Sequence, residues 1–132
     1  MIVVDASAVT DFLLELGPRG EWVAERIGGQ DALHVPHLLD FEVASAIRRV
    51  TLSGQATPAL GRRALDDLRE IPFVRYPAAG LLERVWTLRK SLSAYDASYV
   101  ALAEALDAPL VTTDGRLARS SGHRAAIDSF SG

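Results

Sequence analysis

The sequence predicts an α/β fold of three layers, in which helices cover both faces of a central, mainly parallel sheet. Short apolar runs alternate along the chain with longer segments whose apolar residues recur at helical spacing. No repeat, low-complexity tract or linker interrupts the 132 residues. A chain of this length has room for one hydrophobic core, so we expect a single domain over residues 1–132.

The first part of the chain predicts a strand followed by two helices. The strand covers roughly residues 1–5, and Ser7 is a candidate N-cap for a helix that continues to Leu16. Gly17-Pro18 ends this helix, and a second helix extends to about Ile27, where two glycines follow. A strand that leads into helices and then into another strand is the unit from which parallel sheets are built.

A second strand and a long helix come next. Residues 33–35 form the strand, and Pro36 opens a helix that carries Glu42 and ends at Gly54. Four apolar residues of this helix keep the spacing of a buried stripe, namely Leu39, Val43, Ile47 and Val50. Glu42 lies on the flank of the stripe.

The second half of the chain predicts three strands and three helices. An N-cap followed by proline starts the first of these helices at Thr57-Pro58, and Ser93 caps the helix that bears Asp96. The other expected segments are a strand over 73–76, a helix over 81–92, a strand over 110–113 after Pro109, and a last strand over 125–127.

The composition is that of an ordinary globular protein, with 48% apolar and 23% charged residues. No apolar run approaches the roughly 20 residues that span a bilayer, and no secretion signal opens the sequence. The absence of cysteine excludes disulfides, zinc–thiolate sites and cysteine nucleophiles. The net charge of −3 argues against a protein that coats nucleic acid electrostatically. We therefore expect a cytoplasmic protein without membrane contact.

Four carboxylates stand where a soluble domain gains little structurally from them: Asp5, Glu42, Asp96 and Asp114. Two of them directly follow apolar strands, and two lie within helical patterns. An acid at the C-terminal end of a buried parallel strand points into the crevice where open α/β sheets bind ligands. A set of oxygen ligands suits a hard cation such as Mg²⁺. The pattern therefore predicts a metal site, at which a phosphodiester is oriented and water is activated.

Three of these carboxylates also have a purely structural explanation. Asp5 fits a turn after a strand, and Asp114 fits an Asp-Gly turn. Asp96 fits the first turn of a helix, where an acid interacts favourably with the helix dipole. Glu42 has no comparable explanation, because it lies inside a helix beside the buried stripe. One metal site accounts for all four positions more simply than separate explanations do.

The residues around these acids resemble the motifs of PIN-domain nucleases. The matching segments are Asp5-Ala6-Ser7 after the first strand, Glu42 in the helix that follows Pro36, the segment from Tyr95 to Glu104, and the segment from Leu110 to Asp114. Each motif is weak alone, but their order and spacing make the resemblance specific. It runs from about residue 1 to residue 127, and within the superfamily the chain is similar to the small VapC-type toxins of bacterial toxin–antitoxin pairs.

This resemblance implies a metal-dependent endoribonuclease with a three-layer, PIN-like fold. The residues that match the family's ligands for Mg²⁺ or Mn²⁺ are Asp5, Glu42, Asp96 and Asp114. Ser7 and Thr113 match the hydroxyl positions beside them, although an N-cap and an ordinary strand-end threonine explain these two equally well. The resemblance further implies an RNA substrate, a cognate VapB-like antitoxin that covers the acidic groove, and a homodimer.

Two other functions stay open. A phosphatase of the haloacid-dehalogenase type also begins with an aspartate after the first strand. It requires a second aspartate where this chain has Ser7, and a late lysine, whereas no lysine follows Lys90. A PIN-like module without catalytic activity would act only by binding a partner.

Basic, aromatic and histidine side chains indicate less about the function. Arg49 and Arg116 are among the arginines that fit solvated faces, although some of these would guide RNA phosphates. Tyr95 and Tyr99 fit helix packing, with base stacking as the alternative. His34 and His37 lie on either side of Pro36, and we expect no shared metal there.

Overall fold

The computed structural model describes all of residues 1–132. One sheet contains its five strands, which are β1 (Val3–Val4), β2 (Leu33–Pro36), β3 (Phe73–Tyr76), β4 (Leu110–Thr112) and β5 (Ile127–Ser129). The strand order is β3-β2-β1-β4-β5, and every neighbouring pair is parallel. The predicted parallel sheet is confirmed, and β1, the first strand in the chain, lies at its centre.

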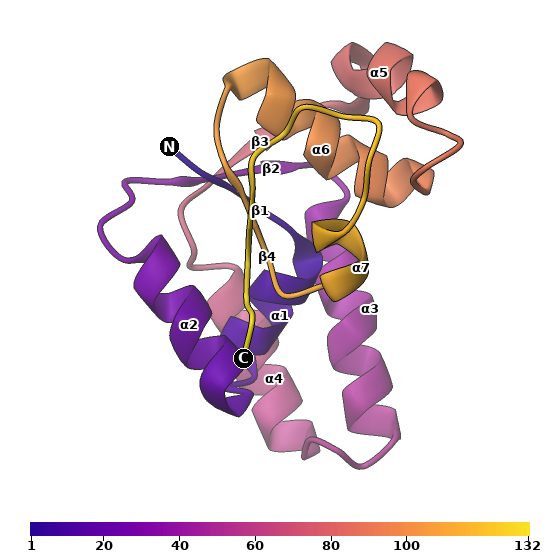
Figure 1. The fold of residues 1–132 in the computed structure, drawn as a ribbon. Helices are drawn as coiled ribbons and strands as arrows, with labels where there is room; N and C mark the ends of the chain where they lie inside the picture. The colour runs from indigo at the N-terminus through magenta and orange to yellow at the C-terminus, as the bar shows by residue number, and fades with distance from the viewer.

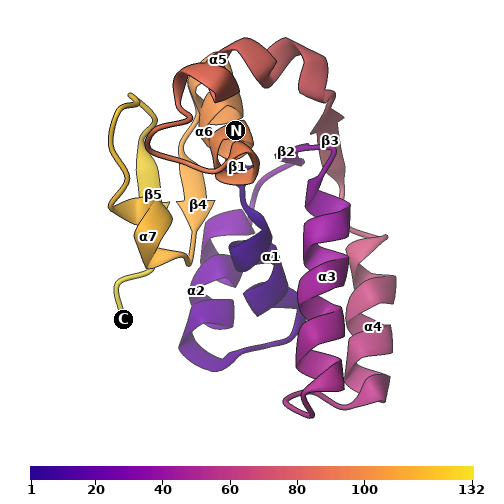
Figure 2. The ribbon, with the colours of Figure 1, turned by 90° about the vertical axis from the view of Figure 1, so that its right-hand side faces the viewer.

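Helices cover both faces of this sheet. They are α1 (Ala6–Leu13), α2 (Gly17–Ile27), α3 (Leu39–Leu52), α4 (Pro58–Leu68), the 3₁₀ helix η1 (Ala78–Leu81), α5 (Leu82–Thr87), α6 (Ala94–Leu106) and α7 (Gly115–Ala118). Helix α6 packs on β1, β2 and β4 with α5 beside it, whereas α1 packs on β4 and against α2, α3 and α4. Figures 1 and 2 show these two groups of helices on opposite sides of the strands. The expected three layers are therefore confirmed.

The core explains how firmly the site-bearing helices are held. Every residue of α6 from 97 to 103 is buried, because this helix lies between the sheet and its neighbours. In α3 the predicted stripe is buried at Leu39, Val43 and Ile47, which leaves Glu42 at the edge of the packed face. Gly61 of α4 lets that helix approach α3, since a Cβ there would lie 2.6 Å from the hydroxyl oxygen of Thr51.

Two expected helix starts are wrong. Asp5, not Ser7, is the N-cap of α1, because the chain turns into the helix directly after β1 and the Asp5 carboxylate accepts a hydrogen bond from the amide of Ala8. Pro36 does not open α3. It ends β2, where it pairs with Tyr76 of β3, and the helix begins three residues later at Leu39.

Three boundaries in the second half also differ from expectation. The helix expected over 81–92 is a 3₁₀ turn followed by α5, which already ends at Thr87. Strand β4 stops at Thr112, and β5 begins at Ile127 because its register pairs that residue with Leu110. The short helix α7 was not expected at all, since an Asp-Gly pair reads locally as a turn.

None of the helices combines the length and the apolar character that crossing a membrane requires.

Candidate active site

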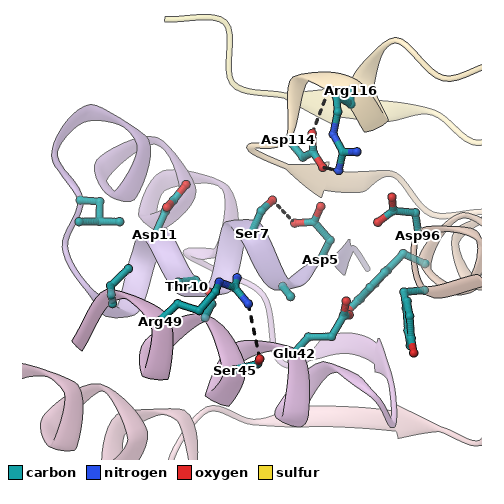
Figure 3. A pocket seen from close by; sticks show the side chains of 16 residues that line it. Asp5, Ser7, Thr10, Asp11, Glu42, Ser45, Arg49, Asp96, Asp114 and Arg116 are labelled. Carbon is teal, nitrogen blue, oxygen red and sulfur yellow. Dashed lines mark hydrogen bonds and ion pairs between the residues drawn. The ribbon is translucent and has the colours of Figure 1, made fainter. Parts of the chain in front are cut away.

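The four predicted carboxylates line one open pocket of about 550 Å³. They come from four separate segments: the end of β1, the first turn of α3, the first turn of α6, and the N-cap of α7. Figure 3 shows Asp5, Glu42, Asp96 and Asp114 directed toward one common space. The meeting of β1 and β4 explains part of this geometry, because Val4 pairs with Val111 and the amide of Asp5 donates to the Val111 carbonyl.

Asp5 is the most buried of the four, with 5% of its surface exposed. Its carboxylate accepts hydrogen bonds from the Ser7 hydroxyl at 2.7 Å, the Ala8 amide at 2.9 Å and the hydroxyl of Thr112. Burial raises the pKa of Asp5 to about 6, in spite of these three bonds, and the negative charge of Asp114 adds to the rise. These hydrogen bonds therefore hold Asp5 in a fixed orientation. Burying its negative charge is unfavourable, and a bound cation would offset that cost.

Thr112 connects Asp5 to Asp114. Its hydroxyl donates to Asp5 and accepts the amide of Asp114 at 3.0 Å, so that one side chain fixes the ends of both strands. The predicted site residue Ser7 lies beside this pair, 3.3 Å from the Thr112 hydroxyl oxygen. The Thr113 hydroxyl instead donates to Asp11 at 2.6 Å. Thr112 and Asp11 were not identified from the sequence.

Glu42 is positioned by a residue on the opposite layer. The Tyr99 hydroxyl donates to Oε1 of Glu42 at 2.6 Å, and Tyr99 itself is 1% exposed. Half-burial raises the pKa of Glu42, the bond from Tyr99 lowers it, and the charge of Asp96 raises it again. Burial, followed by the bond to Glu42, holds the pKa of the Tyr99 hydroxyl far above its usual range, so this group stays a donor. The sequence could have indicated that Tyr99 faces the site, because Asp96 and Tyr99 are three positions apart on one helix and residues at this spacing share a face.

Asp96 in the first turn of α6 and Asp114 at the N-cap of α7 complete the cluster. The Ser93 hydroxyl accepts the amide of Asp96 at 3.1 Å, which confirms Ser93 as the N-cap of α6. Burial raises the pKa of Asp96, the charge of Asp114 raises it further, and Arg116 partly opposes both. Asp114 caps α7 through the Arg116 amide at 2.9 Å and forms an ion pair with the Arg116 guanidinium at 3.2 Å.

The chemistry of this donor set fits a hard divalent cation. Carboxylate and hydroxyl oxygens are the ligands that such ions prefer. Burial raises the pKa values of Asp5, Glu42 and Asp96, and a bound cation would favour their charged forms. No three Asp, Glu or His side chains lie close enough together to hold a metal ion directly. Carboxylate oxygens of Asp5, Glu42 and Asp114 are engaged by Thr112, Tyr99 and Arg116 respectively. An ion that keeps several of its waters suits this wider spacing.

Side chains outside the predicted set also line the pocket: Ala6, Thr10, Asp11, Leu16, Ser45, Ala46, Arg49, Val50, Tyr95, Tyr99 and Arg116. Burial raises the pKa of Asp11, the bond from Thr113 lowers it, and Arg19 lowers it further. Asp40, two residues before Glu42, does not line the pocket, because its carboxylate forms an ion pair with Arg75 at 2.7 Å.

Comparison with known proteins identifies the family of this chain. The model of the PIN domain matches residues 2–122. The VapC ribonuclease Mb0985 of Mycobacterium bovis is 52% identical over 117 residues, which cover 89% of this chain and 88% of that protein.

Solved structures with the same fold include PAE2754 from Pyrobaculum aerophilum, which has a TM-score of 0.70 and 28% identity and covers 96% of this chain and 82% of its own. VapBC2 from Rickettsia felis, solved with a DNA fragment from their promoter, has a TM-score of 0.69 over 99% of this chain and 100% of its own, at 12% identity. This chain belongs to the PIN-domain family and, within it, to the VapC ribonucleases.

Proposed function

We propose that this chain is an endoribonuclease toxin that hydrolyses RNA phosphodiester bonds with a bound Mg²⁺ or Mn²⁺. The observation that carries the proposal is the convergence of four carboxylates from separate segments on one open pocket. Its relatives are named as ribonucleases, and the match covers 89% of this chain. The nuclease class follows from the family, whereas the metal and the individual residue roles are part of the proposal.

Asp5, Glu42, Asp96 and Asp114 are the residues that would hold the cation. A divalent ion at such a site lowers the pKa of water and stabilises charge on the attacking and leaving oxygens. The protein's part is to keep its carboxylates ionised and oriented. Ser7 and Thr112 donate to Asp5, and Tyr99 donates to Glu42, so these hydroxyls favour the charged forms of the acids. Ser7 therefore serves as a positioning donor, and no protein nucleophile is required.

The rival functions find less support. The phosphatase reading requires an aspartate at position 7, and the Ser7 hydroxyl donates to Asp5 in its place. A module that only binds partners does not require acids in a pocket whose pKa values are raised by burial, whereas such groups are typical of active sites.

We extend the proposal to the partners of this chain: RNA as substrate, a VapB-like antitoxin as inhibitor, and a second copy in a homodimer. Four large apolar side chains are well exposed on α3, α5 and α6, namely Phe41, Leu82, Trp86 and Tyr95. Exposed apolar surface of this kind commonly marks contacts with another protein. Residues 1–132 act as one domain in this proposal, since 27 buried residues form one core cluster.

The site assignment is tested by Asp5→Asn. Asparagine keeps the N-cap and most of the packing but removes the charge, so we expect cleavage of single-stranded RNA in Mg²⁺ to fall by at least about 100-fold. Asp40→Asn is the matched control, because Asp40 lies in the same region but pairs with Arg75 outside the pocket. Cleavage by Asp5→Asn at the wild-type rate would show that the site is elsewhere.

The metal is tested separately by calorimetric titration. Mg²⁺ or Mn²⁺ should bind the wild type and restore cleavage after chelation, and binding should be weaker in Asp5→Asn. Absence of binding by either ion would favour the inert module.

A further inference from the structure

The pocket continues beyond the carboxylates into the space between α1 and α3. Thr10 and Asp11 of α1 line one wall of this extension, and Ser45 and Arg49 of α3 line the other. Figure 3 shows the Arg49 side chain reaching from α3 toward the carboxylates. None of these four residues has a part in the proposed metal site.

Arg49 lies on the same face of α3 as Glu42. The seven positions that separate them make about two helical turns, or roughly 10 Å along the axis. Nη1 of Arg49 lies 3.5 Å from the Ser45 hydroxyl, one turn earlier, so the guanidinium is directed back toward Glu42. A stacked nucleic-acid strand advances about 3.4 Å per nucleotide. Arg49 is therefore within one to three nucleotides of a phosphate held at the carboxylates.

Arg49 is also the pocket's one basic side chain without an ion pair. The other, Arg116, is bound to Asp114. Arg49 forms no ion pair in the structure, although Asp11 lines the same pocket. A guanidinium left free beside four acids is suited to an anion brought by the ligand. An RNA strand needs such a cation, because the carboxylates repel every phosphate that the metal does not neutralise.

A second observation comes from Thr10 on the opposite wall. This residue is 7% exposed, and its hydroxyl is the one buried side-chain polar atom without a hydrogen-bond partner. Threonine in a helix populates two side-chain rotamers, so the hydroxyl can turn toward the pocket. A phosphate or ribose oxygen there would satisfy a group that the protein leaves unsatisfied.

We propose that Arg49 and Thr10 form a subsite for a backbone phosphate of single-stranded RNA, next to the bond that is cleaved. This subsite rests on the proposed ribonuclease function. It holds the strand without reading its sequence, because phosphate contacts position a nucleic acid and base contacts specify it. Its effect is on substrate binding and not on the chemical step.

The test compares Arg49→Ala with Arg48→Ala by steady-state cleavage of single-stranded RNA in Mg²⁺. Arg48 is the matched control, because it is the neighbouring exposed arginine on α3, forms no ion pair and does not line the pocket. We expect Arg49→Ala to raise KM about 5- to 10-fold with little change in kcat, and Arg49→Lys to recover part of the loss. The slope of log affinity against log salt should fall by about 0.7, the value for one lost phosphate contact on a single strand.

A methylphosphonate series identifies the phosphate. Each RNA of the series carries one uncharged linkage near the cleaved bond. One position of this linkage should weaken binding to the wild type, whereas the same RNA should bind Arg49→Ala as well as unmodified RNA does. Thr10→Val should raise KM by a smaller factor and should not lower the melting temperature, since the lost hydroxyl has no partner in the protein. An unchanged KM in Thr10→Val removes Thr10 from the subsite.

The outcomes separate the two proposals. If the wild type cleaves RNA and Arg49→Ala has the KM and salt slope of Arg48→Ala, the subsite is wrong and the ribonuclease stands. If Arg49→Ala leaves KM unchanged but weakens binding of the antitoxin, Arg49 serves a protein carboxylate and the RNA subsite is likewise wrong. If the wild type cleaves no RNA under any metal condition, the proposed function and the subsite both fail.

Discussion

The hydroxyl of Tyr99 donates a hydrogen bond of 2.6 Å to Oε1 of Glu42, and so joins α6 to α3 across the pocket. Fifty-seven positions separate these residues in the chain. Tyr99 is buried on the same helix that carries Asp96, so the bond couples two of the four carboxylates to one rigid element.

Removing this bond should weaken the site without unfolding the protein. Tyr99→Phe keeps the buried ring but leaves Glu42 without its donor, which raises the pKa of Glu42 further. We expect metal affinity to fall several-fold, cleavage to fall by about tenfold, and stability to fall by roughly 1–2 kcal/mol. Calorimetric Mn²⁺ titration and cleavage assays measure these effects. Tyr95→Phe is the control, because that hydroxyl is exposed and makes no hydrogen bond; equal metal affinity in both variants would contradict the coupling.

Thr112 and Thr113 should differ in importance. Thr112→Val removes a donor from the buried carboxylate of Asp5, and we expect a loss of roughly 1–3 kcal/mol in stability together with at least about tenfold slower cleavage. Thr113→Val removes only the bond to Asp11, so its effect on cleavage should be smaller. Parallel denaturation curves and rate measurements decide between them. A larger loss of activity in Thr113→Val would support the sequence-based assignment of that hydroxyl to the catalytic set.

Stability of the metal-free protein should depend on the ionisation of Asp5. The pKa of Asp5 is about 6 in the folded state, against 3.8 for the ordinary group, so the folded state binds the proton more tightly. This contribution is fully present below about pH 4 and is lost as the pH rises to about 6. Its size is on the order of 3 kcal/mol.

Melting temperatures in a chelating buffer measure this effect. The wild type should lose stability relative to Asp5→Asn between about pH 4 and pH 7, since asparagine does not titrate. Mg²⁺ should flatten the difference, because the cation favours the ionised carboxylate. Parallel profiles for the two proteins in chelator would rule out the buried, protonated Asp5.

A second buried acid should behave in the opposite way. The Glu104 side chain is 2% exposed, and it binds Arg84 of α5 at 2.7 Å and the amide of Arg124 before β5 at 2.9 Å. The bond from Arg84 lowers the pKa of Glu104, so its contribution to stability is present above the ordinary pKa of 4.5 and is lost as the pH falls below that value.

Glu104→Ala should therefore lower the melting temperature by several degrees at pH 7 and by less at pH 4. Glu83→Ala is the control, because Glu83 is exposed on α5 and makes no side-chain hydrogen bond. A melting temperature equal to that of the control at pH 7 would show that Glu104 does not hold α5 and the C-terminal segment to α6.

The local sequence predicts many of the structural elements of this protein. The apolar strands, the stripe of α3, and the caps at Thr57 and Ser93 follow from the spacing of neighbouring residues, and the structure contains all of them. The strand-end positions of Asp5 and Asp114 predicted a shared location, because parallel strands end at the same edge of a sheet. The expected helix starts were wrong where two local rules competed, as at Ser7 and Pro36.

Only the tertiary structure decided which groups hold the carboxylates. Thr112 and Thr113 are adjacent in the chain and chemically identical, yet Thr112 ends β4 and donates to Asp5, whereas Thr113 follows the strand and donates to Asp11. The partnership of Tyr99 with Glu42 and the free guanidinium of Arg49 likewise depend on how α3 packs against its neighbours. The spacing of neighbouring residues does not predict contacts between distant segments, because these contacts form only when the helices pack on the sheet.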